Sequence, residues 1–415
     1  MKKQLALLML LGPLSMFAQG FQIHTQGIKQ QAMGNAGAAY VQDAATIYYN
    51  PGGLAFVNDN GAILGSNVII AKSAFLDSRA KTVSNSTGGP SVTGQFYTSY
   101  GFDSLASGPL QNMRVGLGVY TPFGAGVEYA DDWFGRFVVR KFALSTLNLQ
   151  PTVSYSMLDG KLGVGAGFVL SLGSMTRLAD ANTADSTSGN FMSIEVGGRF
   201  VGAGVNLGLT YKVTDDLTLG TSFRSPFKGN IKDGDVTITN RPVELKDTVP
   251  DNTVDLTINF PTVFSVGAAY AINDKIDVTL DYNFYGFSTT DTVKIDFDKN
   301  TNSFEDRVDP QELQNAHAIM FGAQYKVTDA ISARAGLRYA TSAVQDGFVK
   351  PDAADANRLA YTVGCGYNLN KNFTIDAVYG FEAVNRENGV SDYYDFEGDY
   401  KTFASTIGLS LTYKY

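Results

Sequence analysis

The sequence predicts an all-β protein: a 14-stranded antiparallel transmembrane β-barrel with an N-terminal hatch, or plug, in its lumen. The first observation behind this prediction is composition, with 17% charged residues, 12% aromatic residues and 44 glycines among 415 positions. Soluble globular proteins carry roughly 25% charged residues. After residue 18 no apolar run reaches the ~18 residues that a membrane helix needs. The other two observations are a recurring turn and a strict two-residue alternation.

The recurring turn follows a tyrosine at the end of a strand-like run. Each tyrosine precedes a short polar segment rich in Asp and Asn, whose side chains bond the local backbone and favour tight turns. Long polar connections alternate with these short turns, as in outer-membrane barrels, which have short turns on the periplasmic rim. We therefore expect an aromatic girdle at that rim, formed by Tyr155, Tyr211, Tyr270, Tyr325 and Tyr367.

The runs between the turns alternate between apolar and polar residues. In residues 276–284 the even positions are apolar or aromatic, whereas Asp277, Thr279 and Asp281 point the other way. A period of two indicates strands with one apolar and one polar face. About fourteen such runs begin between residues 62 and 401, and an even number suits a single-chain barrel. A soluble all-β protein is the alternative, which the asymmetry of the two rims disfavours.

The N-terminus reads as a secretory signal peptide over residues 1–18. Lys2 and Lys3 supply the positive charge, residues 5–14 form a short apolar region, and the small residue Ala18 marks the expected cleavage site. No cysteine stands at that site, so a lipoprotein is not expected. The mature chain is predicted to be exported and to contain a hatch over residues 19–60 and a barrel over residues 61–415.

Residues 19–60 lack strand alternation. Asp43 is expected to cap a short helix, and Asn50-Pro51-Gly52-Gly53 forces a turn. Such a segment can trail into the periplasm or fold into the lumen as a plug. Its apolar side chains, such as Ile47 and Leu54, favour the plug.

Several function classes are excluded by composition and motifs. The net charge of −8 gives no electrostatic footprint for nucleic acid. The single cysteine, Cys365, excludes a disulfide framework, and two isolated histidines give no metal site. No Gly-x-Ser-x-Gly motif is present. We expect no enzyme activity, no cofactor and no metal.

Three hatch segments, Gly20-Phe-Gln-Ile, Met33-Gly-Asn-Ala-Gly-Ala-Ala-Tyr and residues 43–54, resemble the N-terminal hatch of the FadL family. These are outer-membrane transporters of long-chain fatty acids and other hydrophobic compounds. Asn50 and Pro51 match the family pattern, and Gly52 replaces its usual alanine. The resemblance continues along the chain, for example in residues 118–126 and 255–261.

The resemblance implies passive transport by a protein of the outer membrane. A long-chain fatty acid or other hydrophobic molecule is captured at an extracellular groove and moves to an inner site near the start of the hatch. It then leaves sideways into the lipid through a gap at a kinked third strand. The partners are thus a hydrophobic small molecule and membrane lipid, and a monomer is favoured. A secretion-system barrel that docks exported proteins is the alternative function, because such barrels share the hatch pattern.

The resemblance also suggests ligand-binding residues. Phe21 lies at the start of the hatch, and Arg177 falls near a position where the family places a basic side chain for a carboxylate. A second family lysine is absent, because residues 313–317 read Leu-Gln-Asn-Ala-His. Trp133 and Phe134 are candidates for the outer groove or for an interfacial aromatic belt.

The kink of the third strand is expected at Pro122, Gly124 and Gly126. Proline removes a ladder hydrogen bond and glycine weakens a strand. The alternative is an ordinary strand end leading into a loop. Arg334 and Arg338 should face the lumen, where pairing with carboxylates is favoured over ligand contact.

Overall fold

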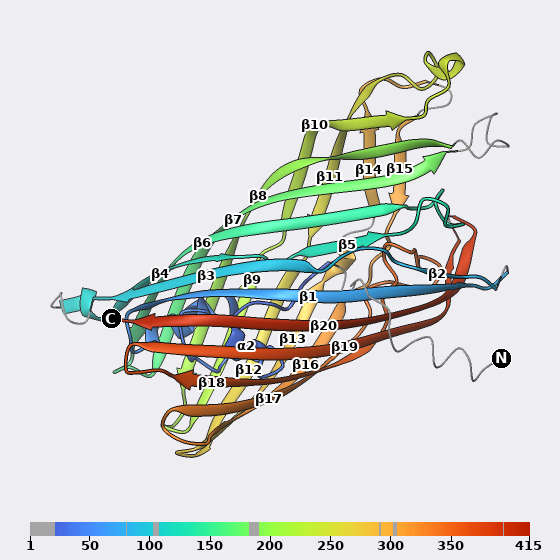
Figure 1. Ribbon diagram of the computed structural model, residues 1–415. Coiled ribbons are helices and arrows are strands. Elements are labelled where there is room, and N and C mark those ends of the chain that lie inside the picture. Colours follow the sequence, from blue (N-terminus) through green and yellow to red (C-terminus); the bar gives the residue numbers. More distant parts are fainter. Residues whose placement is uncertain are drawn as a thin grey trace.

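The computed structural model is a single barrel of tilted strands, with short helices of the hatch inside it (Figure 1). The predicted signal peptide lies outside the described part of the chain and stays a prediction. The structure describes residues 21–79, 81–102, 108–181, 191–289, 292–301, 305–392 and 394–415.

Fourteen antiparallel wall strands close the barrel in this described part, which confirms the predicted fold class. Five of them are interrupted and consist of two labelled segments. In chain order the wall is made of β1 (Gly61–Asp77), β3 (Ser91–Gly101), β4 (Met113–Tyr120) with β5 (Gly124–Glu128), β6 (Lys141–Met157), β7 (Leu162–Ala181), β8 (Met192–Lys212), β9 (Leu217–Arg224) with β10 (Phe227–Thr239), β11 (Asn252–Phe260) with β12 (Thr262–Asn273), β13 (Ile276–Gly286) with β14 (Thr292–Phe297), β15 (Arg307–Pro310) with β16 (Ala316–Lys326), β17 (Ile331–Ala340), β18 (Arg358–Asn368), β19 (Phe373–Ser391) and β20 (Phe396–Lys414).

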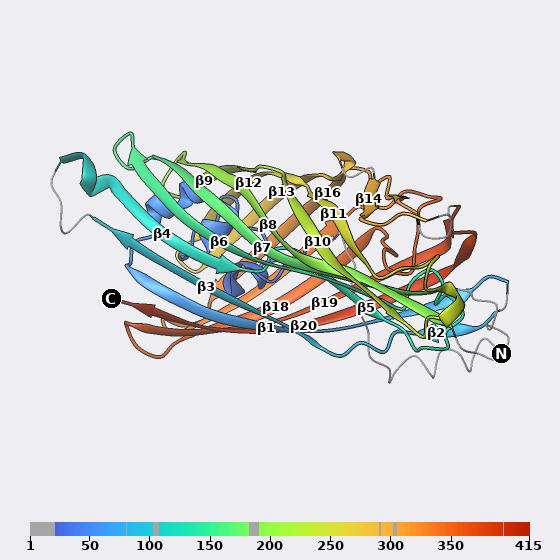
Figure 2. The same cartoon turned by 90° about the horizontal axis from the view of Figure 1, so that it is seen from above.

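Closure pairs the first strand with the last. β1 runs antiparallel to β20 from Gly61↔Lys414 to Asp77↔Gly398. The strands lie side by side around the wall (Figure 2), and their backbone groups pair with neighbouring strands, as a lipid environment requires, except beside β5. Among the described helices, none is long and apolar enough to cross a membrane.

The two faces of the wall differ as the alternation predicted. Along β13, Leu280 is 54% exposed on the outer face, whereas Thr279 and Asp281 are buried on the inner face. Four of the girdle tyrosines, Tyr211, Tyr270, Tyr325 and Tyr367, are exposed on the outer face. The outer face of the barrel is therefore apolar, and its inner face is polar in the half that carries the short turns.

The remaining elements are short. The first three in chain order lie in the hatch, and the others lie between segments of the wall. They are α2 (Ile28–Gln31), α3 (Thr46–Tyr49), η1 (Pro51–Phe56), β2 (Val83–Asn85), η2 (Gly108–Asn112), η4 (Val243–Leu245) and η5 (Phe287–Thr289).

The hatch segment, residues 21–60, lies within the barrel, in the half that carries the short turns (Figures 1 and 2). Polar side chains of the wall bond its backbone. The Asp281 carboxylate accepts from the N–H groups of Gly37 and Ala38, both at 2.7 Å. Arg224 Nη2 donates to the carbonyl of Tyr48 at 2.8 Å. These bonds satisfy hatch backbone groups that would otherwise be buried without partners.

The short hatch helix begins later than the sequence suggested. α3 starts at Thr46 with Ala45 as its N-cap, and no side chain caps it. Asp43 Oδ1 instead accepts from the N–H of Ala45 at 3.0 Å, and its other oxygen lies 3.1 Å from Lys29 Nζ. Asp43 therefore caps the turn that leads into α3, because its carbonyl also accepts from the N–H of Thr46 at 3.1 Å, while the ion pair uses its other carboxylate oxygen.

Asn50 and Pro51 fix the turn after α3. Asn50 Oδ1 accepts from the N–H of Gly52, and Asn50 Nδ2 donates to the carbonyl of Leu209 on β8 at 2.9 Å. Pro51 begins η1, where its missing N–H costs no hydrogen bond. One side chain thus shapes the turn and fastens it to the wall.

Wall glycines let the hatch backbone approach the barrel backbone directly. A Cβ added at Gly208 would lie 2.0 Å from Asn50 Oδ1, and one at Gly165 would lie 2.2 Å from the carbonyl oxygen of Pro51. The small residues that alternate along these strands are therefore the docking surface of the hatch.

We expect the substitution Gly208→Val to displace the hatch while leaving the barrel folded, because the added side chain overlaps Asn50 and the backbone of Pro51. Liposome swelling with a small sugar should show a permeability above that of the wild type. Gly94→Val is the matched control, since nothing lies within 4 Å of a Cβ at Gly94 on β3. Equal permeability of the two variants would contradict this role for Gly208.

Candidate ligand path through the wall

The third wall strand breaks at Pro122 and opens a window. β4 pairs with both neighbours, β3 and β6. β5, which follows the break, pairs with β6 alone. β3 pairs with β4 only from Phe96 onward, so its residues 91–95 face β5 across a gap. The wall closes again where the N–H of Thr87 donates to the carbonyl of Glu128 at 2.7 Å.

The start of the hatch pairs with this break from the inside. The N–H of Ile23 donates to the Pro122 carbonyl at 3.0 Å, and the N–H of Gly124 donates to the Phe21 carbonyl at 2.8 Å. Three residues of hatch thereby replace, on the lumen side, part of the missing strand neighbour. Two backbone groups at the break, the carbonyl of Pro122 and the N–H of Gly124, therefore have partners in the hatch.

A cleft of about 750 Å³ occupies the window. Ile23 lines its lumen side, and the exposed Leu147 and Leu172 line its lipid side. Gly124 and Gly126 also line it, and a Cβ at Gly126 would have no neighbour closer than 4.0 Å. The cleft thus connects the start of the hatch with the outer face of the barrel.

Inside the window the lumen is apolar. In the half of the barrel that carries the long loops, the inward side chains of β6 to β11 form one hydrophobic cluster. It includes Leu144, Met175, Val196, Phe200, Phe227, Ile231, Leu256, Ile258 and Phe260. Barrel interiors of this class are ordinarily polar, so this lining is suited to an apolar occupant.

Phe21 lies at the centre of the apolar region. Its ring makes edge contacts with Phe123, Phe260 and Phe287, with centroids 6.1, 5.4 and 5.8 Å apart. It also lines an inner pocket of about 100 Å³ together with Phe142 and Leu144. Because Phe142 and Leu144 line the window cleft too, the inner pocket and the window share a wall.

The connection between β17 and β18, residues 341–357, folds over the mouth of the barrel. Ion pairs hold it: Lys350 Nζ lies 3.1 Å from Asp309 Oδ1, and Arg177 Nε lies 3.5 Å from Asp352 Oδ2. Asp355 pairs with Arg358 at the start of β18. Arg177, Lys350 and the three aspartates all line the inner pocket.

Tyr394 joins the same group from the connection between β19 and β20. Arg177 Nη2 lies 3.3 Å from its hydroxyl oxygen, and the hydroxyl donates to Asp309 at 3.4 Å. Burial raises the pKa of Tyr394 to about 12, and the neighbouring Arg177 opposes that shift. The phenol therefore stays protonated and available as a donor at neutral pH.

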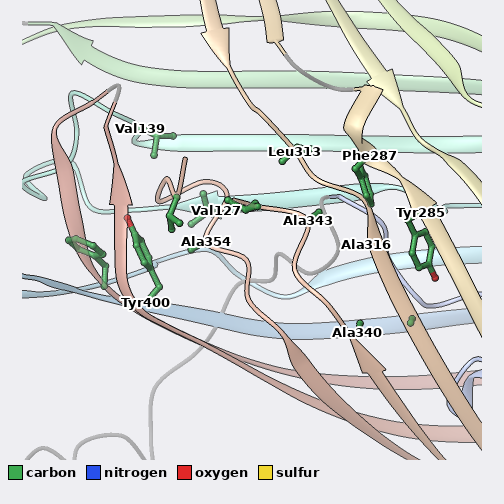
Figure 3. Packing of buried hydrophobic residues seen from close by; sticks show 14 of the residues in the cluster. Val127, Val139, Tyr285, Phe287, Leu313, Ala316, Ala340, Ala343, Ala354 and Tyr400 are labelled. Atoms are coloured by element: carbon green, nitrogen blue, oxygen red, sulfur yellow. The ribbon is translucent and has the colours of Figure 1, made fainter. Parts of the chain in front are cut away.

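A second apolar cluster joins the folded connection to neighbouring elements at the mouth (Figure 3). The figure shows Val127, Val139, Ala354 and Tyr400 converging from different elements. Trp133 belongs to this cluster.

The two predicted groove residues differ in exposure. Trp133 is 5% exposed, stacks on Tyr129 at 4.0 Å and donates from Nε1 to the Val139 carbonyl. Phe134 is 37% exposed and stacks on Phe396 at 5.2 Å. Phe134 is therefore the more accessible of the two at the rim.

Beneath the pocket, buried charges join the hatch to the wall. Arg334 Nη1 lies 2.7 Å from Asp376 Oδ1, and Lys29 Nζ lies between Asp43 and Asp376 at 3.1 and 3.9 Å. Burial alone would lower the pKa of Lys29, but the two carboxylates raise it. Burial, with Arg338 and Arg358 nearby, lowers the pKa of His24, which is neutral at pH 7.

Sequence reasoning pointed to Arg177, Phe21 and the third-strand break, which the structure brings to one region. It missed Leu144, Lys350 and Asp352. Phe142 and Leu144 stand at alternate, inward positions of β6, a signal that the alternation contained. Nothing in the sequence indicated that residues 341–357 fold inward. Within the described residues, no group of three or more His, Cys, Asp or Glu side chains could hold a metal ion.

Comparison with known proteins gives a consistent result. Residues 10–415 match the family model described as outer membrane protein transport protein (OMPP1/FadL/TodX). A putative outer membrane protein of Neisseria meningitidis serogroup B is 24% identical, over 97% of this chain and 96% of the relative. Outer membrane protein P1 of Haemophilus influenzae is 24% identical over 78% and 73% of the two chains.

Two solved structures share the fold. A FadL homologue of Pseudomonas aeruginosa superposes with a TM-score of 0.80 at 16% identity, covering 95% of this chain and 99% of its own. The toluene transporter TodX of Pseudomonas putida gives 0.71 at 19% identity, covering 94% and 99%. The family consists of outer-membrane transport proteins and not of enzymes. The chain therefore belongs to the OMPP1/FadL/TodX family and is an outer-membrane β-barrel transport protein.

Proposed function

We propose that this protein takes up long-chain fatty acids or other hydrophobic molecules by passive diffusion and releases them sideways into the outer membrane. The observation that carries the proposal is the apolar lumen between the hatch and the mouth, which opens through the window at Pro122. A polar solute gains nothing from such a lining, whereas each buried CH₂ of an apolar ligand contributes about 0.8 kcal/mol.

The path has three stages. Phe134 at the rim, beside Trp133, is the place of first capture. The inner pocket, with Phe21 at its base and Arg177 in its wall, is the second stage. Phe142 and Leu144 then separate the pocket from the window, where Gly124 and Gly126 leave room for the ligand to pass. Lateral release keeps the ligand out of water at every stage.

The ladder closes within one chain, because β1 pairs with β20, and we propose that a monomer is sufficient. Toluene is the substrate named for the related transporter TodX. A neutral aromatic hydrocarbon therefore stands beside oleate as a test ligand.

We expect the substitution Gly126→Trp to reduce uptake to the level of a strain that lacks the gene, because the indole fills the window from β5. A Cβ at Gly126 has no neighbour closer than 4.0 Å, so the side chain can enter without disturbing the wall. Uptake of labelled oleate and labelled toluene by a complemented deletion strain measures the effect.

Leu280→Trp is the matched control, because Leu280 is exposed on the lipid face of β13, far from the lining of the window. It should leave uptake unchanged. If Gly126→Trp folds, as judged by heat-modifiable migration, and still transports at the control rate, the lateral route is wrong.

A further inference from the structure

The polar end of the inner pocket has an unusual charge pattern. Its lining carries two cations, Arg177 and Lys350, and three carboxylates, Asp309, Asp352 and Asp355. Each cation is already paired, Lys350 with Asp309 and Arg177 with Asp352. The charges that could attract a ligand carboxylate are therefore neutralised by the protein's own side chains.

Two polar atoms of these charged side chains nevertheless lack a hydrogen-bond partner. Within the described residues, Arg177 Nε and Asp352 Oδ1 are buried and have no hydrogen-bond partner. Arg177 Nε lies 3.5 Å from the other carboxylate oxygen, as an ion pair without hydrogen-bond geometry. The Asp352 side chain is 9% exposed. One unused donor and one unused acceptor thus belong to two paired residues that line the same apolar pocket.

The complement of such a pair is a hydroxyl group. A hydroxyl both donates and accepts, so a single oxygen can donate to Asp352 Oδ1 and accept from Arg177 Nε. A carboxylate only accepts, and it would be placed against the Asp352 carboxylate, a like charge. An alkane leaves both atoms without partners, which costs free energy in a buried site.

We propose that the inner pocket selects an uncharged hydrophobic molecule that carries a hydroxyl group, such as a long-chain alcohol or an alkylphenol. The apolar tail lies along Phe21, Phe142 and Leu144, and the hydroxyl lies between Arg177 and Asp352. This assignment rests on the proposed function, because it names the ligand class of the same pocket.

The test compares three ligands of equal chain length: 1-decanol, decanoate and decane. Equilibrium dialysis of the purified protein in detergent at pH 7.5 measures binding, with partition into protein-free micelles subtracted. We expect decanol to bind about tenfold more tightly than either of the others, a difference of ~1.4 kcal/mol. Equal binding of decane and decanol would overturn the hydroxyl assignment and leave hydrophobic transport standing. If none of the three binds, the proposed function fails as well.

The substitution Asp352→Asn removes the negative charge of this side chain while nearly keeping its shape. It frees the Arg177 guanidinium from its carboxylate, and we expect decanoate binding to strengthen about tenfold, or ~1.4 kcal/mol, while decanol binding weakens. Asp346→Asn is the matched control, since Asp346 belongs to the same connection but is fully exposed and pairs with Arg386 outside the pocket. Decanoate binding as tight as decanol binding in the wild type, or an unchanged preference in Asp352→Asn, would overturn the proposal.

Discussion

Deletion of residues 19–50 is expected to leave a folded barrel that leaks small polar solutes. The fourteen wall strands pair with one another everywhere except beside the window, and β1 pairs with β20, so the ladder that closes the barrel does not run through the hatch. The hatch, by contrast, occupies the polar half of the lumen, and its removal leaves Asp281, Asn206 and the other wall groups to water. Liposome swelling with small sugars should rise from background to a clear rate.

The control for the deletion is the migration of the barrel on a gel before and after heating, which reports folding independently of permeability. Gly208→Val should give a smaller leak of the same kind, because it displaces the hatch without removing it. A deletion variant that folds and stays impermeable would mean that the segment is not the plug of the lumen.

The second large effect is expected at Asp376. The substitution Asp376→Ala leaves Arg334, which is 5% exposed, without its carboxylate, and removes one of the two anions beside Lys29. Breaking a buried ion pair by removing one partner costs about 3–5 kcal/mol. The free energy of unfolding, measured by urea titration in lipid vesicles, should fall by that amount.

Asp215→Ala is the control, since Asp215 is exposed in a short turn, and it should unfold at the wild-type midpoint. The double variant Arg334→Met/Asp376→Leu should recover part of the loss, because no unpaired guanidinium is left in the wall. An unchanged midpoint for Asp376→Ala would show that water or another anion replaces the carboxylate.

Most of the fold was predictable because it depends on the two-residue period of apolar side chains and on the number of strand-like runs. A strand in lipid has an apolar and a polar face, so residues such as Leu280 and Asp281 reveal their sides from the sequence alone. The tyrosines beside the short turns marked one rim, and the even number of runs matched a closed wall. Arg334 met Asp376, as expected for a lumen arginine, whereas Arg338 pairs with Glu382.

The candidate site was less predictable because it depends on contacts between distant connections. The resemblance suggested Arg177 as a candidate, but its partner Asp352 lies in a connection whose inward fold has no local signature. The ion pair between Asp43 and Lys29 likewise joins residues 14 positions apart, and no local pattern indicates it. Alternation places a side chain on a face, and it does not tell which loop will cover that face.

The two hydrogen bonds between the start of the hatch and the break at Pro122 have a thermodynamic consequence. The edge of a strand that faces lipid needs partners for its N–H and C=O groups, and here Phe21 and Ile23 supply them. Widening the window and loosening the hatch would each break these same two hydrogen bonds. The equilibrium between a narrow and a wide window is therefore linked to the equilibrium between a docked and a loosened hatch. By reciprocity, a ligand that favours the wide window weakens hatch docking by the same free energy with which a loosened hatch favours the ligand. The width of the window and the docking of the hatch in the lumen are therefore expected to change together.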